Sequence, residues 1–108
     1  MPSLCREGEV LATVEVADTR AARRRGLLGR DGVDGGLVLT PARAVHTLGM
    51  RFALDVAYLD AAGTVLATRR MRRHRVGAPR WKARSVLEAE AGTFDRWALQ
   101  PGDVVEIR

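Results

Sequence analysis

Cysteine, lysine and long apolar runs are nearly absent from this sequence. Its single cysteine, Cys5, excludes an intramolecular disulfide, and without a cysteine cluster we expect no zinc site. No apolar stretch approaches the ~20 residues that a membrane-spanning helix needs. The N-terminal residues also lack the apolar core of a secretory signal. We therefore expect a soluble, cytoplasmic protein without a membrane span and without a bound cofactor.

Acidic residues are missing between Ala61 and Leu87, where eight basic residues occur. The net charge of the chain is +5, and Lys82 is its only lysine. Such an uneven positive charge favours an anionic partner. Because no RNP, KH or helix-turn-helix motif accompanies it, a solvated, arginine-rich hairpin is the competing interpretation, and nucleic-acid binding would be weak and non-specific. The candidate anion-binding residues are Arg69, Arg70, Arg72, Arg73, Arg75, Arg80, Lys82 and Arg84.

The length of 108 residues and the 46% hydrophobic content predict one globular domain over residues 1–108. Alternating or apolar runs predict five or six strands, and two short helices interrupt them. The strands are expected over residues 9–17, 36–40, 52–60, 64–73, 84–91 and 104–107, and the helices over 19–29 and 93–99.

Successive strands are joined by turns rather than by long helical crossovers. In particular, residues 53–72 are predicted to form an antiparallel hairpin with its turn at 60–63. The sequence therefore predicts a mainly β fold, a compact antiparallel β-sandwich or distorted barrel, with two short peripheral helices.

Three blocks in this order resemble the bacterial and archaeal family called domain of unknown function 192. They are VEVADTRAARRRGLLGR, HTLGMRFALDVAYLDAAGTV and SVLEAEAGTFDRWALQPGDVVEI. The resemblance covers about residues 13–107. It departs at His46–Met50, where many members have Trp-Met-Lys-Asn-Thr, so that this chain resembles a His-Thr variant. The resemblance implies a jelly-roll-like or distorted-barrel fold, and it implies no established reaction, cofactor or substrate.

The acids Asp55 and Glu88 are the main candidates for a site. Asp55 interrupts an apolar strand, so it needs a partner. That partner is either a loop or arginine that fixes the strand, or a ligand. Glu88 is either a surface acid near Arg84 or a member of a polar pocket. The candidate pocket residues are His46, Thr47, Asp55, Glu88, Arg25 and Arg30.

Three interpretations of function remain open. The favoured one is a non-enzymatic binding or accessory module that takes a small polar ligand or a protein partner. The second is a hydrolase-like enzyme in which Asp55 orients His46 as a general base, although no nucleophile is evident. The third is a weak anion or nucleic-acid binder that uses residues 69–84. The spacing of His46, Asp55 and Glu88 does not support a metal site.

Overall fold

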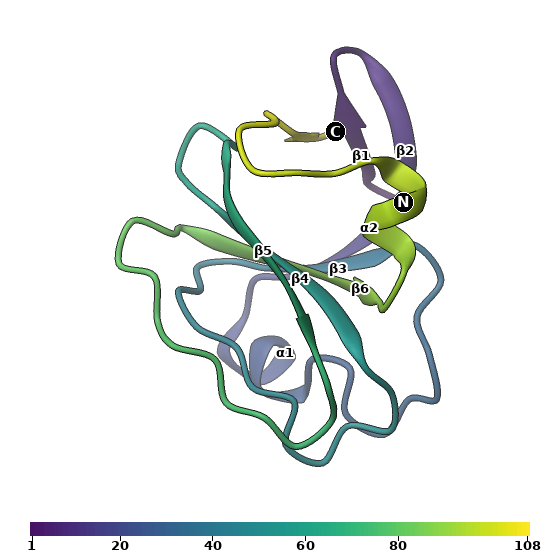
Figure 1. Cartoon of the computed structure of the whole chain (residues 1–108), viewed down its shortest axis with the longest axis vertical. Helices are drawn as coiled ribbons and strands as arrows, with labels where there is room; N and C mark the ends of the chain where they lie inside the picture. Colours follow the sequence, from purple (N-terminus) through teal and green to yellow (C-terminus); the bar gives the residue numbers. More distant parts are fainter.

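The computed structural model describes all residues from Met1 to Arg108. Seven strands and two short helices follow one another along the chain (Figure 1). The elements are β1 Ser3–Arg6, β2 Glu9–Ala17, α1 Arg20–Arg25, β3 Gly36–Leu39, β4 Leu54–Leu59, β5 Val65–Met71, β6 Ser85–Glu90, α2 Thr93–Trp97 and β7 Glu106–Ile107. Neither helix is long and apolar enough to cross a membrane.

The strands form one sheet in the order β5-β4-β6-β3-β2-β1-β7. The prediction of a mainly β fold with two short helices is confirmed. The expected sandwich or distorted barrel is realised as a single mixed sheet that does not close. Every neighbouring pair is antiparallel except β2 and β3, which are parallel. The expectation of purely antiparallel pairing is wrong at this point, because the segment that contains the short helix α1 crosses over between β2 and β3 and leaves them parallel.

Local sequence signals account for most of the elements. Thr19 begins α1 as its N-cap, and its hydroxyl accepts a hydrogen bond from the Ala22 amide at 3.1 Å. Asp60 forms the turn of the β4–β5 hairpin by accepting bonds from the amides of Ala62 and Thr64, each at 2.9 Å. The predicted antiparallel hairpin is therefore confirmed. Strand β1 was not predicted, because its residues, SLCR, do not alternate between apolar and polar side chains.

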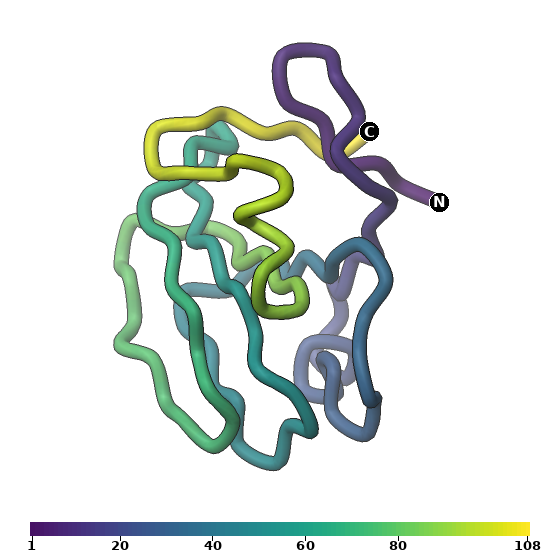
Figure 2. Tube along the Cα trace, turned by 45° about the vertical axis from the view of Figure 1, so that its right-hand side comes forward, coloured from purple at the N-terminus to yellow at the C-terminus, as the bar shows by residue number.

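The sheet separates two apolar cores, one on each face. Leu54, Val56 and Tyr58 of β4 point to the core beneath α1. Ala57 and Leu59 point to the opposite core, which Phe94 and Leu99 close from the α2 side. The tube in Figure 2 shows α2 crossing in front of β4, on the face away from α1. Because alternate residues of a strand face opposite sides, the register of β4 and β6 decides which core each side chain enters.

Asp55 anchors α2 to the sheet. Its side chain is 4% exposed, and it accepts hydrogen bonds from the amides of Gly92 at 2.9 Å and Phe94 at 3.0 Å. It also accepts from Arg70 Nε at 3.0 Å. No side chain of α2 itself provides an N-cap, so Asp55 satisfies the free amides of this helix end from a neighbouring strand. Asp55 is thus the hydrogen-bonded strand acid that one interpretation of the sequence expected.

We expect Asp55→Ala to lower the free energy of unfolding by about 1–3 kcal/mol, because it leaves buried amide donors without an acceptor. Asp95→Ala is the matched control. Asp95 is an exposed acid that pairs with the same arginine, Arg70, at 3.0 Å, and an exposed pair of this kind contributes at most ~1 kcal/mol. Urea unfolding of both variants measures the difference, and equal losses would contradict the anchoring role of Asp55.

Candidate functional site

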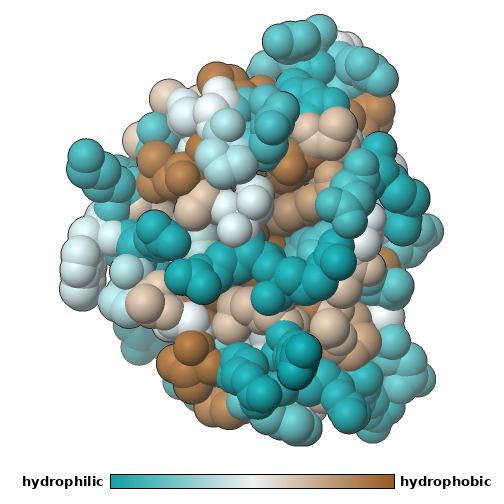
Figure 3. Space-filling view, in the orientation of Figure 1, coloured by the Kyte–Doolittle hydropathy of each residue, from teal (hydrophilic) through white to brown (hydrophobic).

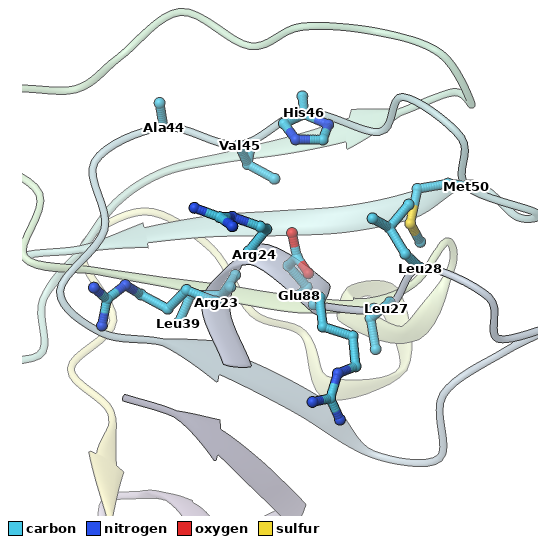
Figure 4. A pocket seen from close by; sticks show the side chains of 12 residues that line it. Arg23, Arg24, Leu27, Leu28, Leu39, Ala44, Val45, His46, Met50 and Glu88 are labelled. Atoms are coloured by element: carbon cyan, nitrogen blue, oxygen red, sulfur yellow. The ribbon is translucent and has the colours of Figure 1, made fainter. Parts of the chain in front are cut away.

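A pocket of about 90 Å³ lies between α1 and the loop that carries His46. Its wall contains three consecutive arginines from the last turn of α1, the apolar residues that follow them, and Glu88 from β6 (Figure 4). Such a volume holds a few water molecules or one compact chemical group. The complete lining is Arg23, Arg24, Arg25, Gly26, Leu27, Leu28, Leu39, Ala44, Val45, His46, Met50 and Glu88.

Glu88 is the buried polar residue of this pocket. It lies in β6 between β3 and β4, where its cross-strand neighbours are Leu37 and Val56. The residue is 5% exposed, and its side chain has no hydrogen-bond or ion-pair partner in the protein. No side-chain oxygen of the chain is both fully buried and without a partner, so the carboxyl group opens onto the pocket. Figure 4 shows its carboxyl group directed toward the space between α1 and the His46 loop. The interpretation of Glu88 as a surface acid near Arg84 is therefore wrong.

Burial raises the pKa of Glu88 to about 7. The charged form loses its hydration between two apolar neighbours, and no cation pairs with it to offset this cost. Near neutral pH the group is therefore divided between the acid, which donates a hydrogen bond, and the carboxylate, which only accepts. A carboxyl that is buried, unpaired and directed into a pocket is a candidate functional group.

The arginines of α1 make the wall of the pocket positive. Arg24 and Arg25 are exposed, whereas Arg23 is half-buried and donates to the Thr40 carbonyl at 3.2 Å. Of the two predicted arginines, Arg25 lines the pocket and Arg30 does not. Arg30 forms a two-pronged ion pair with Glu15, at 2.6 and 3.0 Å, which lowers the pKa of Glu15. Arg30 thus ties the segment after α1 to β2.

His46 and Thr47 have different roles. His46 is exposed and lines the pocket, and its Nδ1 accepts a hydrogen bond from the Leu48 amide at 3.2 Å. Thr47 is fully buried. Its hydroxyl donates to the Arg72 carbonyl at 2.5 Å and accepts from the Arg75 amide at 2.9 Å. Thr47 therefore holds the His46 loop against the segment after β5 and does not reach the pocket lining.

The sequence hypothesis that Asp55 joins His46 and Glu88 in one site is not supported by this geometry. Val56 is the cross-strand partner of Glu88, so Glu88 faces the α1 side whereas Asp55, one residue earlier, faces the α2 side. Both oxygens of Asp55 are bonded to α2 or Arg70, and no hydrogen bond joins Asp55 to His46. The pairing of His46 with Asp55 fails because adjacent strand residues point to opposite faces of the sheet.

The predicted basic residues line the open edge of the sheet and the loop that follows it. All of them are exposed except Arg80, which is half-buried with its guanidinium 5.5 Å from the centre of the Tyr58 ring. Arg70 is neutralised by Asp55 and Asp95. Figure 3 shows hydrophilic side chains gathered on the face over β5. A groove of about 530 Å³ lies here, with Arg69, Arg70 and Arg72 on one side and Arg75 on the other.

The fold and the pocket define a small mixed-sheet domain with one unpaired acid in an arginine-walled cavity. This chain belongs to the domain of unknown function 192 family, described as "Uncharacterized ACR", whose model matches residues 3–107. It is 31% identical over 98 residues to a UPF0127 protein of Thermococcus gammatolerans, and 29% identical over 99 residues to one of Thermococcus sibiricus. The matches cover 85% and 86% of this chain and 64% of each relative, so the chain spans less than two-thirds of their length.

Two crystal structures are similar to this chain. One is a protein of Sinorhizobium meliloti 1021, provisionally described as a transcription regulator, with a TM-score of 0.81 and 24% identity over 98% of this chain and 91% of that one. The other is a protein of unknown function from Novosphingobium aromaticivorans, with a TM-score of 0.78 and 20% identity over 97% and 82% of the two chains. At these identities the likeness establishes the fold.

The titration of Glu88 predicts how stability depends on pH. In the unfolded chain the carboxyl group has its ordinary pKa of 4.5, whereas in the folded protein its pKa is about 7. The folded state therefore binds more protons between these values, and the free energy of unfolding falls as the pH rises through them. Glu88→Gln lacks this titration. We therefore expect its free energy of unfolding, relative to that of the wild type, to increase by up to about 3 kcal/mol between about pH 5 and about pH 8.

Urea unfolding at both pH values measures this gain. Glu9→Gln removes an exposed acid and serves as the control, for which we expect no comparable change. A Glu88→Gln stability difference that is independent of pH would contradict the raised pKa.

The exposed arginines predict weak, salt-dependent binding of polyanions. Each neutralised phosphate releases counterions, so affinity falls steeply with salt. We expect a labelled single-stranded oligonucleotide to bind detectably at low salt and negligibly near ~0.15 M ionic strength. Fluorescence anisotropy at both salt concentrations checks this. Tight binding that persists at the higher concentration would make nucleic acid the leading partner.

Proposed function

We propose that this protein is a non-enzymatic binding module whose pocket holds the polar end of a small organic anion. The observation that carries the proposal is the Glu88 carboxyl, which is buried in a central strand, lacks a partner in the protein and faces the pocket. Burying a carboxyl group without a partner is costly. A ligand that supplies the missing hydrogen bond recovers part of this cost when it binds.

The surroundings of Glu88 restrict the chemistry of the ligand. The positive charges of Arg24 and Arg25 attract an anionic group to the mouth. At the pocket floor, the protonated form of Glu88 donates a hydrogen bond to an anionic or carbonyl oxygen. The apolar side chains of Leu28 and Met50 accommodate a short carbon skeleton. A small carboxylate or phosphate ester with a short apolar portion has all three properties.

An acid–base enzyme is a second candidate, because a carboxyl group with a pKa of about 7 is suited to proton transfer at neutral pH. His46 lines the same pocket and provides a second titratable group. The lining contains no serine, threonine, cysteine, lysine or tyrosine that would act as a nucleophile. We therefore favour binding over covalent catalysis.

The proposal predicts that ligand binding depends on pH through Glu88. A panel of short-chain carboxylates and phosphate monoesters, tested by thermal shift and calorimetry, should contain binders. Their affinity should rise as the pH falls through about 7, because the protonated acid donates to the ligand and the carboxylate repels it. Glu88→Gln should bind with little pH dependence, and Glu88→Leu should lose about tenfold or more in affinity.

Arg24→Ala should weaken binding, whereas Arg20→Ala should not, because Arg20 is an exposed residue of the same helix outside the pocket. Unchanged binding by Glu88→Leu would refute the proposal. Failure of the entire panel to bind would refute the assigned ligand class.

A further inference from the structure

The outer edge of β5 is free of any neighbouring strand, although both ends of this edge are covered. Strand β5 is the last in the sheet and pairs only with β4. At its start, Val65 exchanges backbone hydrogen bonds with the segment 102–103, at 2.8 and 2.9 Å. Just beyond its end, the Arg72 carbonyl accepts the bond from Thr47. Between these points the edge presents unpaired backbone groups to its surroundings.

The alternation of backbone hydrogen bonds along the antiparallel strands identifies these unpaired groups. The Ala91 amide donates to the Ala53 carbonyl at 3.1 Å, so odd-numbered residues of β4 pair with β6 and even-numbered ones pair with β5. The Cα partner of Val56 in β5 is Arg69, so these two residues form a hydrogen-bonded pair. The partner of Ala57 is Thr68, and this pair is not hydrogen-bonded. Because hydrogen-bonded positions alternate in an antiparallel ladder, Thr68 and Arg70 direct their N–H and C=O groups to the open edge.

Residues 69–72 at the open edge form one side of the 530 Å³ groove, and Thr68 lies just outside it, in the neighbouring hollow that Asp95 also lines. Figures 1 and 2 show the segment 72–84 running beside β5 without joining the sheet, and residues 75–78 of this segment line the other side of the groove. Of the four arginines that line it, Arg69, Arg72 and Arg75 have no acidic partner. No acidic residue lines the groove. The groove therefore combines unpaired strand hydrogen-bonding groups with uncompensated positive charge.

We propose that this groove binds an extended acidic peptide segment of another protein, which adds to the sheet as a strand beside β5. Backbone hydrogen bonds from Thr68 and Arg70 hold the peptide, and its carboxylates pair with the arginines. A second copy of this chain does not fit, because edge-to-edge pairing places the same arginines against one another. The sugar–phosphate backbone of a nucleic acid has no regularly spaced N–H groups that could donate to the edge carbonyls, and no aromatic residue in the groove provides a stacking surface.

The test uses the full chain and a fluorescein-labelled octapeptide of alternating glutamate and threonine, measured by anisotropy near ~0.15 M ionic strength. In a control analogue, two adjacent backbone nitrogens at the centre of the peptide are methylated. This analogue keeps the charge of the peptide but loses one N–H donor on each edge of the peptide strand. We expect the analogue to bind about tenfold more weakly, and a lysine–threonine peptide not to bind. Equal affinity for the methylated analogue would overturn strand addition, and oligonucleotide binding as tight as that of the peptide would assign the groove to nucleic acid.

Protein variants separate the groove from the overall charge. The double variant Arg72→Glu/Arg75→Glu should lose about tenfold or more in peptide affinity. Arg20→Glu/Arg96→Glu changes the net charge equally at exposed positions outside the groove, and it should bind the peptide severalfold more tightly than the first double variant. Equal loss in both would overturn the proposal.

Thr68→Pro removes an edge N–H while leaving the ladder to β4 in place, and it should weaken binding severalfold. The methylated peptide tests the same bond if this variant does not fold. If neither the peptide nor the oligonucleotide binds the wild type, the arginines serve only to protect the edge from aggregation, and the proposal fails.

Discussion

The antiparallel register between β4 and β6 is the constraint on which the rest of this structure depends. These strands lie next to each other in the sheet, and both faces of β4 are covered by apolar cores. A shift of one residue would send every side chain of β4 to the other core. The register also determines that Asp55 and Glu88, whose Cα partners are Ala89 and Val56, face opposite sides.

The two buried acids differ in their local partners, which give Asp55 a structural role and leave Glu88 free for the binding role that we propose. Asp55 is satisfied by two amides of α2 and by Arg70, so its negative charge stabilises the packing of the helix on the sheet. Glu88 is buried to nearly the same extent, but it has only apolar cross-strand neighbours and its pKa rises to about 7. A charge without a partner lowers stability, and such a cost is typical of positions that a binding site requires.

Eight of the arginines of this chain fall into three sets with different chemistry. Arg30 and Arg70 are paired with acids and support the fold. Three of the four arginines of α1, Arg23, Arg24 and Arg25, line the pocket of Glu88. Arg69, Arg72 and Arg75 remain unpaired along the groove beside β5. Two separate surfaces therefore carry arginines without acidic partners, and we propose a small anion as the ligand of one and an extended acidic chain as the ligand of the other.

The sequence by itself determined the elements that depend on local signals. Alternation predicted β2, β4, β5 and β6, and Asp60 predicted the hairpin turn. Thr19 predicted the start of α1, and the family resemblance agreed with these elements. The tertiary structure decided what depends on contacts between distant segments. It set the parallel pairing of β2 with β3, the capping of α2 by Asp55, and the location of Glu88 beside α1. Periodicity shows which residues of one strand share a face, but only the packing of other elements shows what covers that face, and this decides whether a buried acid has a partner.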